Sequence, residues 1–287
     1  MFSCDKEPRI AYNFNIDIPD SNFKAALIET YVYEEPEGLL DANRDGEISD
    51  GEAARISNLI LYQYGIKDLT GINAFRNLKS FHCEENQIKS LSISIESLRD
   101  LVFLRNETES IDISGCTKLS VINCSFNKLQ QLDLSNNTLL EHLTCSDNEL
   151  QSVDISNNTK LDWLFFRNNN ISSIDLSNNT ELTYLNIADN DFSIIDLTHN
   201  LKLESILFKN NNFQNIDFSN LAALKSIWIG GNQFTFIDIS NNTEISFIRM
   251  DGEEPFLEQI CVWVMPFPTP EIHLVGIEDE SIFKICD

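Results

Sequence analysis

A repeat of 21 residues runs through most of this chain and constrains its fold more than any other feature. Successive copies of this length begin at Leu98, Leu119, Leu140, Leu161, Leu182, Leu203, Leu224 and Ile245. A copy of 20 residues begins at Leu78, and one of 22 residues begins at Ile56. Because repeats of this size fold as stacked coils that share one continuous core, the pattern predicts a repeat solenoid.

Each copy follows the pattern L-x-x-L-x-[CFI]-x-x-N, which Leu140–Lys160 shows most clearly. The alternation predicts a short strand in which Leu143 and Cys145 face a core while His142 and Thr144 face out. Stacked copies would form a curved parallel sheet with about 4.8 Å between strands. The Asn that follows each strand turns the chain, and its amide would bond neighbouring backbone in a ladder. These residues are Asn86, Asn106, Asn127, Asn148, Asn169, Asn190, Asn211 and Asn232.

A second motif, D-[LIF]-S-N-N-T, places a carboxylate at the same position of successive copies. The residues are Asp112, Asp133, Asp154, Asp175, Asp196, Asp217 and Asp238. Such a column could bind a row of metal ions. We favour a structural role, because Asp and Ser side chains commonly bond local backbone donors in turns. The glycines of a β-roll calcium repeat are also missing.

The copies with a recurring Cys in L-x-x-L-x-C-x-x-N resemble bacterial leucine-rich repeats of the internalin type, and resemble surface proteins of Bacteroidetes-like bacteria even more closely. The segment IKDLTGINAFRNL, residues 66–78, is similar to the first repeats of both groups. The resemblance covers about residues 15–260 and implies a leucine-rich-repeat solenoid whose function is surface adhesion or partner binding. The sequence departs from both groups in one respect, since we expect neither an immunoglobulin-like module nor a sorting domain after the repeats.

Four regions follow from these patterns. Residues 1–14 form an N-terminal tail or tether, and 15–55 a helical cap with a polar loop. Residues 56–255 hold the leucine-rich repeats, and 256–287 depart from the repeat and form an irregular C-terminal cap. Within the first cap, residues 22–33 are spaced as a helix that leads into the loop, and a second helix is expected from Glu52.

The loop of the N-terminal cap matches the EF-hand pattern D-x-[DN]-x-[DN]-G-x₅-E at every position. The expected Ca²⁺ ligands are the side chains of Asp41, Asn43 and Asp45, the carbonyl of Glu47, Ser49 directly or through water, and both oxygens of Glu52. A single loop lacks the usual paired partner, so we expect a structural ion that fixes the cap over the first repeat. The alternative is a polar turn that kept the pattern without binding an ion.

The charge and the motifs exclude several functions. Lys and Arg total 20 against 45 Asp and Glu, for a net charge of −25, which disfavours nucleic acid and anionic lipid as partners. No stretch reaches the roughly 18 apolar residues of a membrane span. No nucleophile, metalloprotease or nucleotide-binding motif is present. We therefore predict that the protein is not an enzyme.

The seven cysteines are an odd number without a C-x-x-C pair, which argues against a disulfide framework or a zinc ribbon. Cys83, Cys124 and Cys145 lie at the core position of the strand. Cys261 and Cys286 flank the last segment, where a disulfide would close the cap and imply export.

The first residues resemble the end of a bacterial lipoprotein signal, with Ser3 before Cys4 and acidic and lysine residues after it. Under this interpretation Cys4 is a lipid anchor that tethers the protein to a membrane. The alternative is an incidental cysteine in a frayed tail. We expect an extracellular or cell-surface location, with an outer-membrane lipoprotein as one form of it, and a monomer.

The outward strand positions carry aromatic and basic side chains in the C-terminal half of the predicted sheet. They are Trp163, Phe165, Arg167, Tyr184, Leu207, Lys209, Trp228, Phe247 and Arg249. Exposed aromatics beside arginine are typical of binding hot spots, so we predict that this concave face binds a partner. A protein is the first candidate and a glycan stacked on the rings is the second. A third interpretation is that the rings only cover the sheet.

Overall fold

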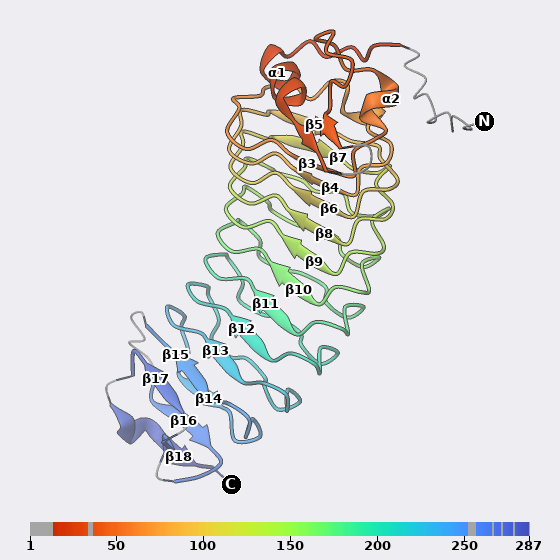
Figure 1. The fold of residues 1–287 in the computed structure, drawn as a ribbon. Coiled ribbons are helices and arrows are strands. Elements are labelled where there is room, and N and C mark those ends of the chain that lie inside the picture. Colours follow the sequence, from red (N-terminus) through yellow and green to blue (C-terminus); the bar gives the residue numbers. More distant parts are fainter. Residues whose placement is uncertain are drawn as a thin grey trace, which may run out of the picture.

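The computed structural model describes residues 14–33, 37–251, 257–265, 267–270, 272–277 and 279–286. These residues form a curved, elongated stack of coils with helices over the N-terminal end (Figure 1). The predicted parallel leucine-rich-repeat solenoid is confirmed. Cys4 and the rest of the predicted tether lie outside the described residues.

One parallel sheet of 11 strands, in the order β17-β15-β13-β12-β11-β10-β9-β8-β6-β4-β3, runs along the stack. Its strands are β3 (Asn58–Ile60), β4 (Ser80–His82), β6 (Asp100–Val102), β8 (Val121–Asn123), β9 (His142–Thr144), β10 (Trp163–Phe165), β11 (Tyr184–Asn186), β12 (Ser205–Leu207), β13 (Ser226–Trp228), β15 (Phe247–Arg249) and β17 (His273–Val275). Equal repeat positions face each other, as Trp163 and Tyr184 do. The sheet therefore lines up each outward position in a column.

The middle residue of each strand and the residue after the strand point into the core. Leu143 and Cys145 of one coil, and Leu164 and Phe166 of the next, are fully buried. Burying one such side chain contributes about 1.5–3 kcal/mol. A single coil has only one layer of these side chains, so its core exists only where another coil lies against it.

The predicted asparagine ladder is present. The Nδ2 atom of Asn148 donates to the carbonyl oxygens of Cys124 and Cys145 at 3.1 and 3.2 Å, and its Oδ1 accepts from the backbone nitrogen of Leu129 at 3.0 Å. Each amide thus bonds its own coil and the preceding one. The same arrangement recurs at Asn86, Asn106, Asn127, Asn169, Asn190, Asn211 and Asn232.

A second asparagine ladder, which the sequence analysis missed, lies on the other side of the coils. The Nδ2 atom of Asn158 donates to the carbonyl oxygens of Leu134 and Asn137 at 3.2 and 2.9 Å. The ladder residues are Asn137, Asn158, Asn179, Asn200 and Asn242, and all are fully buried. Cys116 and Leu221 stand at this position in two other coils. The signal was the second Asn of S-N-N-T, which we had interpreted only as part of a local turn.

The column of aspartates forms hydrogen bonds within the turns of the coils. The Oδ1 atom of Asp154 accepts a hydrogen bond of 2.9 Å from the backbone nitrogen of Ser156, and equivalent bonds recur along the column. Hydrogen bonds from the side chain and backbone of Ser156 lower the pKa of Asp154. These contacts agree with the structural role that we favoured over metal binding.

Both helices of the N-terminal cap are shorter than we expected. The elements of the cap are α1 (Ser21–Glu29), β1 (Tyr31–Val32), β2 (Gly38–Leu39) and α2 (Asp50–Ala53), while η1 (Ile72–Ala74) lies in the first repeat, between β3 and β4. Helix α1 ends before Thr30, whose backbone is extended, because Tyr31 pairs with Leu39 in an antiparallel ribbon. The second helix has four residues, because the chain must enter β3 a few residues later.

The C-terminal segment continues the solenoid more regularly than the departure from the repeat suggested. Strand β17 joins the main sheet, and a second sheet contains β14 (Phe236–Asp238), β16 (Gln259–Val262) and β18 (Phe283–Ile285), with η2 (Glu280–Ile282) before the last strand. Two earlier strands, β5 (Ser90–Ser92) and β7 (Ser110–Asp112), form a separate pair.

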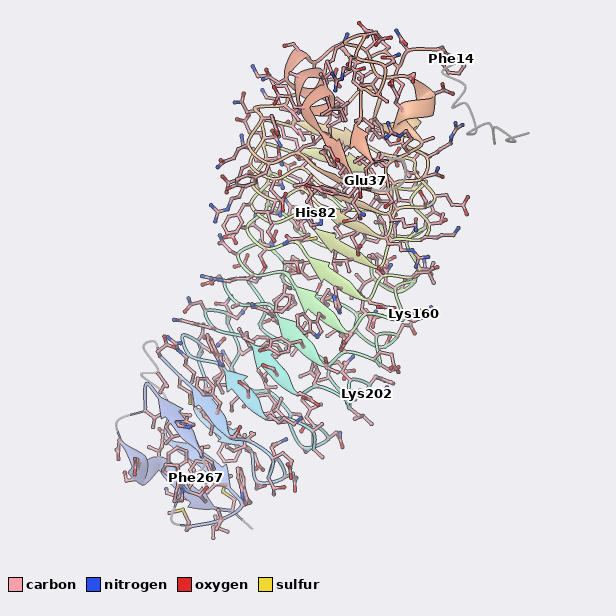
Figure 2. The ribbon with its side chains drawn as sticks, in the orientation of Figure 1. Phe14, Glu37, His82, Lys160, Lys202 and Phe267 are labelled. Carbon is pink, nitrogen blue, oxygen red and sulfur yellow. A yellow bond between two sulfur atoms is a disulfide. The ribbon has the colours of Figure 1, made fainter. Side chains whose placement is uncertain are left out.

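Two contacts close the C-terminal end. Cys261 and Cys286 form a disulfide between β16 and the residue after β18. Phe267 lies at the C-terminal end of the stack (Figure 2). Its ring packs against Phe283 with centroids 4.6 Å apart. These contacts cover the apolar edge of the last coil. Among the described residues, none of the helices has the length and apolar character needed to cross a membrane.

Adjacent asparagines of one turn provide a matched test of the second ladder. We expect Asn158→Ala to lower the free energy of unfolding by about 1–3 kcal/mol, because two buried hydrogen bonds are lost. The Oδ1 atom of Asn158 has no partner in the described part of the chain, so the donated bonds set the size of the effect.

Asn157→Ala should change stability by less than about 0.5 kcal/mol, because Asn157 is exposed. Urea unfolding followed by circular dichroism measures both variants. Equal losses would contradict the assigned role of the ladder.

Candidate functional site

The outward side chains of the main sheet form a surface that we call the strand face. The ring of Trp163 stacks on His142 with centroids 5.0 Å apart and planes at 24°. It also contacts Phe165 at 6.2 Å and Tyr184 at 5.7 Å. Trp163 is 43% exposed, and its neighbours Phe165 and Tyr184 are half-buried. Three adjacent strands thus combine their rings in one cluster.

A second aromatic group lies nearer the C-terminal end. Trp228 of β13 and Phe247 of β15 have ring centroids 5.6 Å apart. The guanidinium carbon of Arg249 lies 4.7 Å from the centroid of the Trp228 ring. Leu207 precedes Trp228 in the same column, and Leu207, Trp228 and Phe247 are all half-buried. The predicted aromatic residues therefore face outward, but they form two groups that also pack among themselves.

Basic side chains border the second group, each held by a carboxylate. Asp251 accepts from Arg249 Nε at 2.7 Å and Nη2 at 2.9 Å, and from Lys209 Nζ at 3.0 Å. The hydrogen bonds from Arg249, together with Lys209, lower the pKa of Asp251 to about 2. Arg167 Nε donates to Asp189 at 2.7 Å. Burial alone would raise the pKa of Asp189, but bonds from Asn210 and Arg167 lower it.

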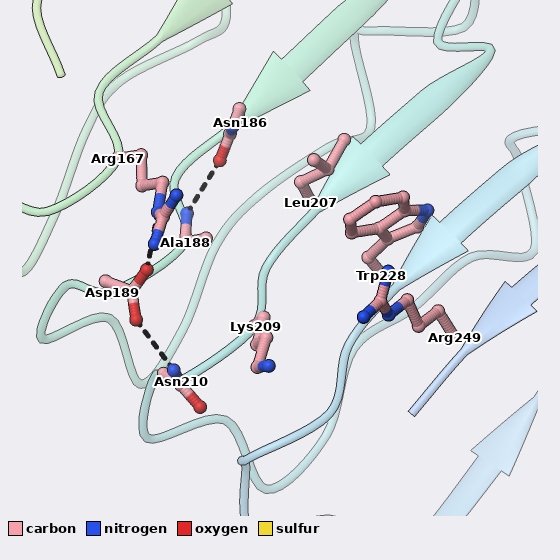
Figure 3. Close-up of a pocket in the computed structure, with 9 residues that line it drawn as sticks. All are labelled: Arg167, Asn186, Ala188, Asp189, Leu207, Lys209, Asn210, Trp228 and Arg249. Atoms are coloured by element: carbon pink, nitrogen blue, oxygen red, sulfur yellow. Dashed lines mark hydrogen bonds and ion pairs between the residues drawn. The ribbon is translucent and has the colours of Figure 1, made fainter. Parts of the chain in front are cut away.

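These side chains surround a cavity of about 220 Å³ on the strand face (Figure 3). Its lining residues are Arg167, Asn186, Ala188, Asp189, Leu207, Lys209, Asn210, Trp228 and Arg249. Five of the nine predicted binding residues thus meet at one cavity. The other four, Trp163, Phe165, Tyr184 and Phe247, lie in the aromatic groups beside it.

Phe126 is a surface aromatic that the sequence analysis missed. It precedes a ladder asparagine, at a position where successive coils have positive φ, and its own φ is 56°. Asp147, Asn168, Asp189 and Asn210 fill this position in later coils, and Asn and Asp adopt such backbone most readily among non-glycine residues. The Phe126 ring is 46% exposed, and the guanidinium carbon of Arg105 lies over it, 4.8 Å from its centroid. A bulky exposed ring at a costly backbone position suggests a role in binding.

In the predicted calcium loop, side-chain oxygens accept hydrogen bonds from the loop itself. Asp41 accepts from the backbone nitrogens of Asp45 and Gly46, and Asp45 accepts from that of Glu47. Asn43 Oδ1 accepts from the Asp45 nitrogen. The carboxylate of Glu47, whose carbonyl is the predicted ligand, forms an ion pair of 2.5 Å with Lys24.

Glu52 is the expected bidentate ligand, but its oxygens are already engaged. They accept from the backbone of Ala42 and Asn43 and from the backbone and hydroxyl of Ser49. Among the described residues, no three acidic, His or Cys side chains form a cluster that could hold a metal ion.

The donor set still fits a hard cation in type and order. Asp41 is 3% exposed and Glu52 is fully buried. Neither has an ion-pair partner in the described part of the chain. Buried carboxylates are usually paired or coordinate a metal. The calcium site remains a prediction, and Glu52 would have to release Ser49 to bind an ion with both oxygens.

The one adjacent histidine–cysteine pair of the strands does not form a catalytic arrangement. Cys83 is fully buried, while His82 lies half-exposed on the strand face, 3.7 Å from Glu84. Burial raises the pKa of the Cys83 thiol far above its usual value. A buried neutral thiol is a poor nucleophile.

No family profile and no curated protein matches the sequence. Solved structures do share the fold. The functional domain of InlJ from Listeria monocytogenes has 21% identity and a TM-score of 0.55, covering 84% of this chain and 66% of that one. A leucine-rich-repeat protein of Leptospira interrogans has 19% identity and a TM-score of 0.61, covering 75% and 57% respectively. YopM, a leucine-rich effector protein from Yersinia pestis, has 18% identity and a TM-score of 0.59, covering 80% and 78%.

These likenesses show that the chain has the leucine-rich-repeat fold. The chain spans just under two thirds of the InlJ structure and just over half of the Leptospira structure. InlJ includes a cysteine ladder. Here Cys124 and Cys145 of successive coils are buried free thiols.

Substitutions at Phe126 separate backbone strain from ring contacts. In Phe126→Asn, relief of a left-handed backbone cost of about 1–2 kcal/mol should offset the lost cation–π contact of about 0.5–1 kcal/mol. Phe126→Ala keeps the backbone cost and loses the ring. We therefore expect the Asn variant to be more stable than the Ala variant by about 1 kcal/mol in urea unfolding. Equal stability of the two would show that the position is not strained.

Proposed function

We propose that this protein is a non-catalytic bacterial recognition module that binds a protein partner through the strand face. The single observation that carries the proposal is the aromatic cluster of Trp163, Phe165 and Tyr184 on solvent-facing positions of adjacent strands. These positions have no core to fill, and aromatic residues beside arginine are enriched where binding energy concentrates. The proposal extends to a secreted or surface-tethered protein, with Cys4 as the candidate anchor.

The ring geometry favours a protein over a glycan. A sugar stacks on an open aromatic face, but His142 covers one face of Trp163 and Arg249 lies over Trp228. The rings instead offer edges and partial faces to apolar side chains, as in protein interfaces. Glycan binding is the second candidate, because Trp163 keeps an exposed part.

Export is supported by the Cys261–Cys286 disulfide, since such bonds persist mainly in oxidising compartments. The net charge of −25 suits a solvated protein outside the cell. Both observations agree with the resemblance of the repeats to those of bacterial surface proteins.

Alanine variants of the two tryptophans test the site. We expect Trp163→Ala and Trp228→Ala each to weaken partner binding by at least tenfold, as hot-spot truncations do. Affinity capture from cell-surface extracts, followed by binding measurements on the captured protein, provides the readout. Ile194→Ala is the matched control, because Ile194 is 76% exposed but lies outside both aromatic groups.

A glycan array run with the same variants separates the two candidates. Array signals that both tryptophan variants abolish would favour a lectin. Binding to any partner that survives both substitutions would place the site elsewhere and contradict the proposal.

We also propose that loop 41–52 holds a structural Ca²⁺ ion. The complete EF-hand pattern and two buried carboxylates that have no cationic partner among the described residues support this proposal. Asp41, Asn43, Asp45 and Glu52 would supply side-chain oxygens, with Glu47 and Ser49 completing the set. The ion would neutralise buried charge and fasten the cap to the first coil.

Calcium should stabilise the fold by mass action. At a free Ca²⁺ concentration of 100 times the dissociation constant we expect a gain of about 2.7 kcal/mol and a higher melting temperature, reversed by EGTA. Asp45→Asn should shift this response to higher Ca²⁺, whereas Asp154→Asn should not, although both carboxylates accept a backbone bond two residues ahead. A melting temperature unaffected by Ca²⁺ and EGTA in the wild-type protein would refute the site.

A further inference from the structure

The cavity on the strand face has an excess of positive charge in a strongly acidic protein. Arg167, Lys209 and Arg249 line it, against the single carboxylate of Asp189. Asp251, which lies beside the cavity, is shared between Lys209 and Arg249. Among these residues, three cations stand against two carboxylates. The chain as a whole has a net charge of −25, so this cavity is a local exception.

Arg167 has guanidinium donors that form no hydrogen bond within the described part of the chain. Within the described residues only its Nε atom is engaged, by Asp189, and its side chain is 58% exposed. Its two terminal nitrogens form the fork that matches a carboxylate, which binds such a fork with both oxygens. Arg249, by contrast, is fixed by Asp251 and by the Trp228 ring. Arg167 is therefore the cation best placed to receive a further anion.

The opposite wall is apolar. Leu207 and Trp228 lie side by side in neighbouring strands, across the cavity from Arg167, whereas Arg249 lies against the Trp228 ring (Figure 3). The volume of about 220 Å³ is smaller than the roughly 300–1,000 Å³ of pockets that hold whole small molecules. The space suits one charged side chain with apolar atoms beside it.

We propose that this cavity receives an Asp or Glu side chain of the protein partner, next to an apolar residue that contacts Leu207 and Trp228. The inference rests on the proposed function, since it specifies the chemistry of the partner at the strand face. The carboxylate binds Arg167 with support from Lys209, and the aromatic groups on either side contribute the remaining contact area. A partner surface without an acidic residue at its centre would desolvate the two terminal nitrogens of Arg167 without giving them an acceptor, which disfavours such partners.

Nuclear magnetic resonance of the ¹⁵N-labelled whole chain tests the inference without knowledge of the partner. The chain has three tryptophans, so the indole N–H signal of Trp228 can be assigned by substitution. The probes are the peptide acetyl-Gly-Glu-Leu-Gly-amide and its counterpart with Gln in place of Glu. We expect the Glu peptide to shift the Trp228 signal saturably at millimolar concentration, and the Gln peptide to bind roughly tenfold more weakly.

Two variants that each replace an arginine with glutamine identify the cation that binds the carboxylate. Arg167→Gln should weaken binding of the Glu peptide by roughly tenfold. Arg76→Gln is the control and should leave it unchanged, because Arg76 is equally a surface arginine but lies in the N-terminal end of the chain, 3.9 Å from Asp50. The melting temperatures of both variants exclude an effect through unfolding.

Equal binding of the two peptides, no saturable shift with either, or an unchanged affinity in Arg167→Gln would overturn the carboxylate site. Tighter, Arg167-dependent binding of N-acetylneuraminic acid than of the Glu peptide would overturn the assignment to a protein side chain. If partner capture still depends on Trp163 but the peptide test fails, only this inference is overturned. Loss of tryptophan dependence would instead remove the proposed function.

Discussion

The whole structure depends on contact between consecutive coils. Each coil contributes one layer of leucines, isoleucines and phenylalanines, and this layer leaves water only when the next coil covers it. Two ladders of asparagine amides link the same coils through backbone carbonyls on both sides of the core. Apolar stacking supplies the driving force, and the ladders fix the register, because an amide one residue out of place would leave buried carbonyls without its bonds.

This register also produces the candidate site. Equal repeat positions pair across the sheet. Residues that are 21 positions apart in the sequence therefore lie on neighbouring strands, which are about 4.8 Å apart. Trp163 thus meets Tyr184, and Leu207 meets Trp228. The core positions are restricted to apolar residues, whereas the outward positions vary freely among coils. Recognition chemistry can therefore be placed on the strand face without disturbing the fold beneath it.

Much of this arrangement was predictable from the sequence, because a repeat converts spacing along the chain into position in space. The parallel sheet, the burial of Leu143 and Cys145 and the ladder through Asn148 all follow from the period. The ladder through Asn158 did not, because S-N-N-T reads equally well as a self-contained turn. The length of α1 and the regular path of the C-terminal segment also differed from the prediction, since neither lies within the periodic part of the sequence.

The site was predictable only in part. Outward placement of Trp163 and Trp228 follows from strand alternation. The stacking of His142 on Trp163 and the sharing of Asp251 between two cations depend on side-chain rotamers that no sequence pattern encodes. Phe126 was missed for a similar reason, because its exposure arises from the left-handed backbone before the ladder asparagine rather than from the strand itself.

The paired ladders have a further consequence for how such a molecule can change in evolution. Each amide bonds only its own coil or the coil before it, so removing or duplicating one complete coil leaves each remaining donor with an equivalent acceptor. Gains and losses in whole units would alter the reach of the protein and the spacing between its two aromatic groups. An insertion between a strand and its ladder asparagine would instead move that amide away from its acceptors, whereas a change in length elsewhere in a coil is tolerated, as the 20-residue copy at Leu78 shows.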